Sequence, residues 1–267
     1  MKLHHELLSK PGAERVLVML HGILGQGGNL RGLARQFIEA QSGWSAVLMD
    51  LRAHGSSQDA PGNADTVANA AADVTETLAA LGLKPHAIVG HSFGGKVALA
   101  LDAPHVMTLD SAPGARPDAR GSESTAEVLQ MLTSFKTGPW PTRDAYVEAV
   151  MQAGQSKMVA QWLAMNLDRR DDGMWFRLPM PRILTLIADY LNLDLWSAVE
   201  QPKPGRQYHL VVGTSSTVYD RDDILRAQEL ETNSQGRVTV DLLDAGHWIH
   251  VEAAAEVLAT MQRRLVD

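Results

Sequence analysis

A serine flanked by glycines stands where a buried strand is predicted to meet a helix. Residues 90–94 read Gly-His-Ser-Phe-Gly, between the apolar run 87–89 and the helix-forming run 95–101. Glycines permit the close packing that such a strand-to-helix turn requires, and the turn exposes the serine hydroxyl. Ser92 is therefore predicted to be a nucleophile that attacks a carbonyl carbon. The alternative is a glycine-rich turn that carries an incidental serine.

Two backbone N–H groups are predicted to face the oxygen on which negative charge would then develop. The N–H of Phe93 opens the helix after Ser92, and a helix N-terminus stabilises negative charge. The N–H of Ile23 follows His21 and Gly22, which come directly after an earlier strand. Each donor of this kind contributes about 3–4 kcal/mol to a transition state, so the pair would form an oxyanion hole. The alternative for the earlier segment is an ordinary loop with a turn glycine.

A histidine near the end of the sequence is the predicted general base. His247 follows the last predicted strand and precedes the last predicted helix, and loops at the carboxyl ends of parallel strands reach the ligand in such folds. Its neutral imidazole would take the proton of Ser92 and return it to the leaving group. His250 is the alternative base, but we expect it to face away from the site. No third ligand at helical spacing accompanies the two histidines, so no metal site is predicted.

The strands and helices that must position these residues alternate along most of the chain. Short apolar runs predict buried strands, and apolar residues spaced three or four apart predict helices. The alternation is typical of a mostly parallel sheet with helices on both faces, so the predicted fold class is α/β. The expected strands span 15–20, 45–50, 86–89, 105–109, 208–212 and 238–243, and the expected helices span 29–40, 65–81, 95–101, 222–230 and 253–265.

The middle of the chain breaks this alternation and is predicted to be an all-helical insertion. The predicted domains are therefore a core of residues 1–113 and 197–267 and a helical cap of residues 114–196. Within the cap, the expected helices span 124–135, 142–151, 157–167 and 181–190, with one short extended piece at 172–177.

The predicted cap is rich in methionine and tryptophan. It holds six of the 11 Met, at 131, 151, 158, 165, 174 and 180, and four of the six Trp, at 140, 162, 175 and 196. Methionine adapts to irregular apolar space, so a cap pressed on the core would form an apolar pocket. The alternative is that these residues form a small core of the cap itself. Without a cluster of Arg or Lys, the pocket favours uncharged acyl groups. The predicted substrate-binding residues are His21, His91, Met131, Met158, Trp162 and Trp248.

Together these motifs resemble the α/β-hydrolase superfamily over residues 16–265. Within it, the chain is most similar to the YbfF-type bacterial esterases and their abhydrolase-11-like relatives. The resemblance implies the chain order nucleophile, acid, histidine, and an insertion that lies over the site as a cap. The markers are His-Gly at 21–22, Asp-Leu-Arg-Ala-His-Gly-Ser-Ser at 50–57, Gly-His-Ser-Phe-Gly-Gly at 90–95 and Gly-His-Trp at 246–248.

The acid that would complete a triad is the least obvious member. Many members of the superfamily carry it after the strand that follows the cap, but residues 213–216 read Gly-Thr-Ser-Ser and hold no carboxylate. The resemblance to the YbfF-type arrangement implies an acid one strand earlier, at Asp110, which would orient His247 and stabilise its imidazolium. Asp220 is the alternative acid, and Asp110 would then only start a turn. Ser216 is predicted to hydrogen-bond the carboxylate or the imidazole as an accessory group.

Composition excludes several other classes of protein. The 267 residues include no cysteine, which excludes disulfides, thiolate nucleophiles and cysteine-bound metals. The formal charge of −7 gives nucleic acid no general attraction. No apolar run reaches the roughly 18 residues of a membrane span, and the first residues lack the apolar region of a signal peptide. We therefore expect a cytoplasmic protein, either a monomer or a homodimer.

The predicted function is hydrolysis of carboxylic esters or thioesters by Ser92, His247 and Asp110, with no cofactor. The expected partner is accordingly a small-molecule ester or thioester. Among enzymes, the alternative is C–C bond hydrolysis or a lyase reaction with the same three residues. Outside enzymes, the alternative is a ligand-binding protein that keeps the fold and the residues without turnover.

Overall fold

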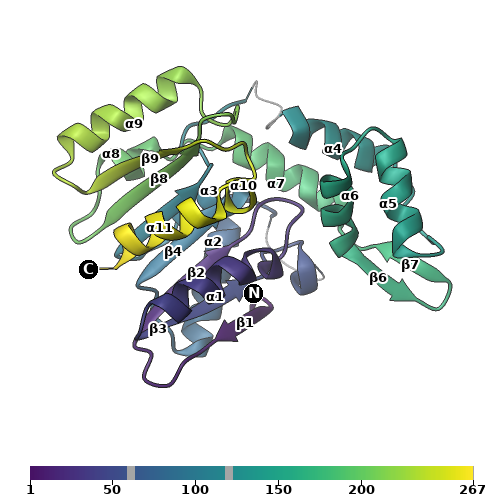
Figure 1. Cartoon of the computed structure of the whole chain (residues 1–267), viewed down its shortest axis with the longest axis horizontal. Helices are drawn as coiled ribbons and strands as arrows, with labels where there is room; N and C mark the ends of the chain where they lie inside the picture. Colours follow the sequence, from purple (N-terminus) through teal and green to yellow (C-terminus); the bar gives the residue numbers. More distant parts are fainter. Residues whose placement is uncertain (59–63, 118–122, 267) are drawn as a thin grey trace.

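A mostly parallel sheet of seven strands forms the centre of the molecule. The computed structural model describes residues 1–58, 64–117 and 123–266. The strand order is β1-β3-β2-β4-β5-β8-β9 (Figure 1), and only β1 runs antiparallel to its neighbour. The predicted α/β class is confirmed, and β1 is a strand that the sequence did not predict. The strands span β1 His5–Leu8, β2 Arg15–Leu20, β3 Trp44–Met49, β4 Ala87–His91, β5 His105–Leu109, β8 Gln207–Gly213 and β9 Val238–Leu243.

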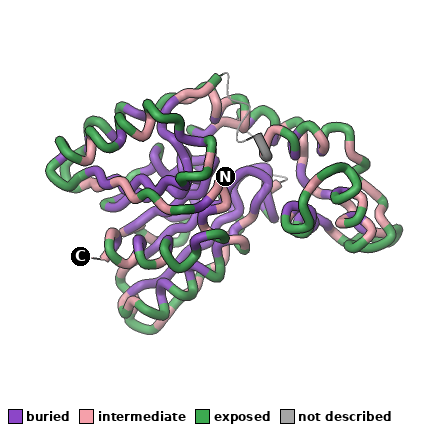
Figure 2. The backbone as a smooth tube through the Cα atoms, turned by 45° about the horizontal axis from the view of Figure 1, so that its top comes forward, coloured by how far each residue is buried: buried purple, intermediate pink, exposed green. Residues whose placement is uncertain are grey.

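Helices cover both faces of the sheet because successive side chains of a buried strand point in opposite directions. In β2, Val18 and Leu20 join the core beneath α2 and α3, whereas Leu17 and Met19 pack with α1 and α11. Figure 2 shows the buried strands between helices whose outer sides are exposed. No helix within the described ranges is long and apolar enough to cross a membrane. These helices span α1 Arg31–Ala40, α2 Val67–Leu81, α3 Phe93–Leu99, α8 Trp196–Glu200, α9 Arg221–Asn233, α10 Ile249–Glu252 and α11 Ala254–Leu265, with 3₁₀ turns η1 Gly27–Leu30 and η2 Gly55–Ser57.

Residues 114–196 leave the sheet after β5 and return before β8, and we call them the inserted segment. Its helices and a two-stranded hairpin lie to one side of the sheet in Figure 1, with α7 nearest to the sheet. The prediction of an all-helical insertion is wrong, because β6 and β7 form an antiparallel pair, but the extended piece expected at 172–177 is confirmed as β7. The elements of the inserted segment are α4 Glu123–Ser134, α5 Arg143–Gln152, α6 Lys157–Leu163, η3 Ala164–Asn166, β6 Leu167–Arg170, β7 Gly173–Phe176 and α7 Met180–Asn192.

The predicted helix 157–167 is α6 as far as Leu163 and the 3₁₀ turn η3 as far as Asn166, and Leu167 already belongs to the hairpin. Leu167 pairs with Phe176 across the hairpin, and both side chains are buried. Trp140 adds a bridge to Met174 through two backbone hydrogen bonds of 2.8 and 2.9 Å. Burial of these side chains therefore outweighs the local helical pattern, since most helical stability in proteins comes from packing and not from propensity.

Acid is expected to destabilise the fold through the buried His209 of β8. Its Nδ1 lies 2.9 Å from Thr239 Oγ1, and burial lowers the pKa of His209 to about 3. As the pH falls below about 6.5, His209 of the unfolded chain becomes protonated, whereas His209 of the folded chain stays neutral until about pH 3. The free energy of unfolding is therefore unaffected by His209 above pH 6.5 and decreases as the pH falls from 6.5 to 3.

Replacing His209 by glutamine is expected to remove that titration. The slope of unfolding free energy between pH 6 and 4 should flatten by about 1.4 kcal/mol per pH unit, the value for one proton. Urea unfolding at several pH values measures the slope. A slope equal to that of the wild type would contradict the neutral, buried state of His209.

Candidate active site

Ser92 occupies a strained turn between β4 and α3. Its backbone angles are φ 50° and ψ −117°, and its N–H donates to the carbonyl of Leu109 at 3.1 Å. A Cβ on Gly90 would lie 2.1 Å from the carbonyl oxygen of Gly94. A Cβ on Gly94 would lie 2.4 Å from the carbonyl oxygen of Leu20. The glycines on both sides of Ser92 are therefore required by close backbone contacts.

A Gly90→Ala substitution is expected to destabilise the protein by at least about 1–3 kcal/mol, the usual cost of overpacking a buried site. Gly32 is the matched control, since it lies in α1 and a Cβ there would meet nothing within 4 Å. Gly32→Ala should raise stability by roughly 0.5–1 kcal/mol, because alanine is the better helix residue. Urea denaturation separates the two, and equal stability of both variants would refute the packing explanation.

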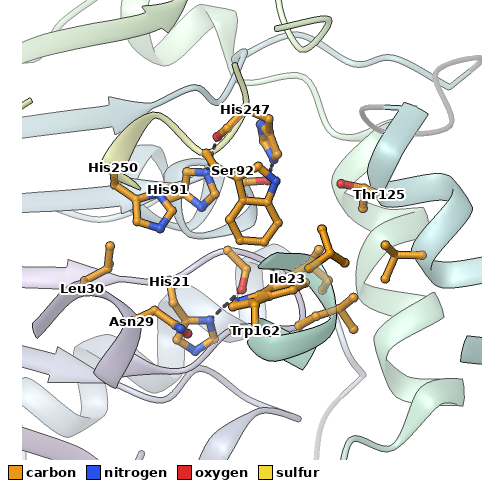
Figure 3. Close-up of a pocket in the computed structure, with 16 residues that line it drawn as sticks. His21, Ile23, Asn29, Leu30, His91, Ser92, Thr125, Trp162, His247 and His250 are labelled. Carbon is orange, nitrogen blue, oxygen red and sulfur yellow. Dashed lines mark hydrogen bonds between the residues drawn. The ribbon is translucent and has the colours of Figure 1, made fainter. Parts of the chain in front are cut away.

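His247 links Ser92 to a buried carboxylate. Its Nε2 lies 3.1 Å from Ser92 Oγ, and its Nδ1 lies 2.7 Å from Asp110 Oδ2. Figure 3 shows the dashed contact between the His247 ring and Ser92. The loops after β4, β5 and β9 carry the three residues, so they meet at the carboxyl end of the parallel sheet. This is where ligands bind in open α/β sheets.

Asp110 is fully buried and directly follows β5. Its φ of 47° is unusual, although aspartate tolerates the left-handed region better than most residues. Its carboxylate accepts hydrogen bonds from Gly213 N at 3.1 Å and from Ser216 Oγ at 2.6 Å, besides the contact with His247. Three donors thus compensate the buried charge, which would otherwise be costly. Ser216 contacts the carboxylate, one of the two partners that the sequence suggested.

Asp220, the other predicted acid, is engaged elsewhere. It is the N-cap of α9, where its Oδ1 accepts the N–H of Asp223 at 2.8 Å. Its side chain is 55% exposed and lies 3.4 Å from Arg116. These contacts are those of a helix cap at the protein surface.

The loop after β2 lies beside Ser92, since a Cβ on Gly22 would come within 3.3 Å of Ser92 Cβ. The N–H of Gly25 bonds the carbonyl of Gly22 at 3.0 Å, and the N–H of Leu24 donates to His54 Nε2 at 3.0 Å. Burial lowers the pKa of His54 to about 3, so its ring is neutral and can accept this bond. The Phe93 N–H begins α3 and therefore has no partner within that helix. The Ile23 side chain lines the space beside Ser92.

An apolar cavity with about 560 Å³ of empty space, part of which is open to solvent, lies beside Ser92 and His247 (Figure 3), and we call it the first cavity. The predicted residues His21, His91, Trp162 and Trp248 line it. The Trp162 and Trp248 rings meet edge to face with centroids 4.4 Å apart, so α6 of the inserted segment contacts the core loop that carries His247. The sequence did not single out several other lining residues, namely Leu24, Asn29, Leu30, Thr125, Val128 and Val159.

The two predicted methionines lie farther from Ser92. Met158 is half exposed and lines an adjoining hollow that shares Trp162 and Trp248 with the first cavity. Met131 does not line the first cavity and instead faces a separate hollow with Glu127 and Gln130. Met131 is partly buried and packs against the core, but the open space that it borders is this hollow.

His250 does not face away from the site, contrary to the expectation. It lines the first cavity, and its ring centroid is 4.3 Å from that of His91. Burial lowers the pKa of His250 to about 4, so the ring is neutral near pH 7. Its Nδ1 is buried without a hydrogen-bond partner among the described residues. The first helical turn after His247 therefore folds back over the turn that carries His91 and Ser92.

His91 and His21 line the first cavity but use ring nitrogens for internal bonds. His91 Nε2 lies 2.8 Å from the carbonyl oxygen of His247 and donates to it, and burial lowers the pKa of His91 well below its ordinary value. His21 accepts the N–H of Leu51 at Nε2, 2.9 Å away. A Cβ on Gly22 would lie 2.7 Å from His91 Nδ1, so this glycine lets the two loops approach. Both histidines therefore hold loops together beside the cavity.

A second cavity, with about 400 Å³ of space, also reaches Ser92 and His247. Arg116 lines this cavity, and its guanidinium group donates to the carbonyls of Thr217 and Val218 and lies near Asp220. No short motif marked its walls in the sequence, because they come from α7 and from loops on either side of the inserted segment. The lining residues besides those named are Ile23, Thr125, Ile187, Tyr190 and Leu191.

Comparisons with known proteins agree with this architecture. A family model described as "Alpha/beta hydrolase family" matches residues 17–260. The chain is 24% identical over 270 residues to "sn-1-specific diacylglycerol lipase ABHD11" of Danio rerio, covering 98% of this chain and 81% of that protein. It is 27% identical over 262 residues to "Esterase YbfF" of Escherichia coli (strain K12), covering 94% of this chain and 93% of that protein.

Solved structures show the same fold. The structure described as "Marine microorganism esterase" superposes with a TM-score of 0.80 at 20% sequence identity, and the match covers 98% of both chains. The resemblance inferred from the motifs is thereby confirmed, and the named relatives support a hydrolase of the esterase or lipase type. The chain belongs to the alpha/beta hydrolase family.

Proposed function

We propose that this protein hydrolyses carboxylic esters with Ser92 as nucleophile, His247 as general base and acid, and Asp110 as the acid that orients His247. The observation that carries the proposal is the hydrogen-bonded series from Ser92 Oγ through His247 to Asp110, beside an apolar cavity. The turn angles of Ser92 and the three hydrogen bonds to Asp110 support it further.

The reaction would proceed in two similar halves. His247 Nε2 takes the proton of Ser92 as its oxygen attacks the carbonyl carbon, and Asp110 stabilises the imidazolium that forms. The N–H groups of Ile23 and Phe93 bind the negatively charged oxygen. The proton then passes to the leaving alcohol, and water attacks the acyl-enzyme in the same way to release the acid. Thioesters fit the same steps, and none of these steps needs a cofactor.

An uncharged ester suits the two cavities that meet at Ser92. The first cavity is walled by Trp162, Trp248 and aliphatic side chains. In the second cavity, Arg116 already bonds two backbone carbonyls and lies near Asp220, so its charge is largely compensated. Two relatives whose names specify a diacylglycerol lipase and an esterase support an ester substrate of this kind.

The inserted segment is proposed to act as a cap over the core formed by residues 1–113 and 197–267. It supplies Thr125, Val128, Val159 and Trp162 to the first cavity. A substrate would therefore be enclosed between the cap and the carboxyl end of the sheet, which keeps bulk water away from the acyl group.

The test is hydrolysis of p-nitrophenyl esters from acetate to dodecanoate, combined with labelling by a fluorophosphonate, which reacts with activated serines. We expect turnover of several esters, an optimum chain length set by the cavity, and one label per chain on Ser92. Turnover with a label on a different serine would refute the assignment of Ser92. Neither turnover nor labelling would favour C–C bond hydrolysis or a ligand-binding protein instead.

A further inference from the structure

Lys96 is a buried lysine one helical turn after Ser92. Only 1% of it is exposed, and it lies on α3. Lysine is seldom fully buried unless it is paired, so its surroundings require an explanation. The proposed reaction does not use its ammonium group.

The Lys96 ammonium binds both ends of the inserted segment. Its Nζ donates to the carbonyls of Gly114 at 2.8 Å, Tyr190 at 2.6 Å and Leu193 at 2.7 Å. Gly114 begins the segment, and the other two residues lie near its end. An ammonium has three donors, and here each one has a carbonyl acceptor. One side chain therefore joins the two connections of the segment to the helix that follows Ser92.

The charged form of Lys96 is favoured by its acceptors and opposed by burial. Burial lowers the pKa of Lys96 to about 8, while Asp194, Asp223 and Asp189 raise it and Arg116 lowers it slightly. The group is thus mainly protonated near pH 7, where the three donors are present.

Tyr190 connects this contact to the substrate. The ammonium lies 4.5 Å from the centroid of the Tyr190 ring, a cation–π distance. The same ring lies 6.3 Å from Phe93 and lines the second cavity together with Ser92 and His247. Burial raises the pKa of Tyr190 to about 12, so it presents a neutral phenol. Lys96 therefore fixes both the backbone and the ring of a residue that faces the reacting atoms.

We propose that Lys96 is a positioning residue that holds Tyr190 as a wall of the second cavity, and so determines which uncharged substituent the substrate can place there. This inference rests on the proposed ester hydrolysis. Loss of the ammonium would release both ends of the inserted segment from α3, widen the second cavity and leave the first cavity and the hydrogen bonds of His247 in place.

The test compares two series of esters with wild type, Lys96→Met, Tyr190→Ala and the double variant. One series keeps p-nitrophenol and lengthens the acyl group, and the other keeps an acetyl group and enlarges the alcohol. Fluorophosphonate titration gives the concentration of competent Ser92, so kcat is expressed per active site. Lys84→Met is the matched control, because Lys84 is exposed in the loop before β4.

We expect Lys96→Met to alter the series whose varied group occupies the second cavity. In that series, the ratio of kcat/KM for the smallest ester to kcat/KM for the largest should change about tenfold relative to the wild type, mainly through KM. In the other series the same ratio should change less than twofold. In the Tyr190→Ala background, Lys96→Met should add less than a twofold shift, since interacting residues are not additive. Lys84→Met should match the wild type.

Equal loss on every ester, or effects of Lys96→Met and Tyr190→Ala that simply add, would overturn the proposal. If Lys96→Met does not fold, Lys96→Gln retains two of the three donors and should give a smaller shift of the same series; no shift in a folded Lys96→Gln protein would equally overturn it. Failure of the proposed function is distinguishable, because the wild type itself would then neither turn over esters nor take the label.

Discussion

Replacement of Ser92 by alanine is expected to lower kcat for a p-nitrophenyl ester by roughly 10⁴–10⁶-fold, the range seen when a triad nucleophile is removed. Without Oγ no acyl-enzyme can form. In the wild type His247 Nε2 lies 3.1 Å from that oxygen, and in the variant it has no serine proton to take. Binding should persist, because the substitution removes only one hydroxyl group from the cavity walls. Initial rates measure the loss, and protection against thermal unfolding by a substrate measures the binding.

Ser215→Ala is the control for this substitution. Ser215 is exposed in the loop after β8, so its loss should change kcat by less than twofold. Alanine at position 92 keeps the same backbone requirements as serine, so the thermal midpoint should stay close to that of the wild type. Undiminished ester hydrolysis by a folded Ser92→Ala protein would refute Ser92 as the nucleophile.

Replacement of Asp110 by asparagine is the second large expected effect, with a loss of about 10³–10⁴-fold in kcat. An asparagine amide in the place of Oδ2 would present N–H groups to His247 Nδ1 or hold the imidazole in the wrong tautomer. It would also place N–H groups against the Gly213 N–H or the Ser216 hydroxyl, which now donate to the carboxylate. KM should change little, because neither cavity is lined by Asp110.

Asp220→Asn separates the two candidate acids. Asparagine is as good an N-cap as aspartate, so the variant should keep its fold and lose less than twofold in kcat. Steady-state kinetics of both variants, with fluorophosphonate titration of Ser92, give the comparison. A large loss in Asp220→Asn with full activity in Asp110→Asn would move the acid to Asp220.

The sheet was predictable because buried parallel strands leave a simple pattern. The predicted spans of β2 and β5, residues 15–20 and 105–109, match the structure at both ends. A strand covered on both faces is a continuous apolar run, which stands out against helical spacing. The motif around Ser92 was readable because close backbone contacts require its glycines: a Cβ on Gly90 would meet the carbonyl oxygen of Gly94, and a Cβ on Gly94 would meet that of Leu20.

The inserted segment was less predictable because distant contacts determine it. The pattern of residues 157–167 predicted a helix as far as Leu167, and only the pairing of Leu167 with Phe176 shows that this residue begins a strand. Met131 belongs to the predicted helix but borders a separate hollow. Lys96 and Tyr190 were not predicted as site residues, because their importance lies in contacts that join residues 94 positions apart.

The position of Asp110 at the end of β5 has an evolutionary consequence. With the carboxylate on that strand, the loop after β8 needs only Gly213 and Ser216 to support it. The following residues, Thr217 and Val218, line the second cavity without touching the carboxylate. Under the proposed mechanism, mutation can therefore change that wall with little penalty to the proton transfer. We expect relatives with the acid after β5 to diversify their substrates through this loop more readily than relatives with the acid in the loop after β8.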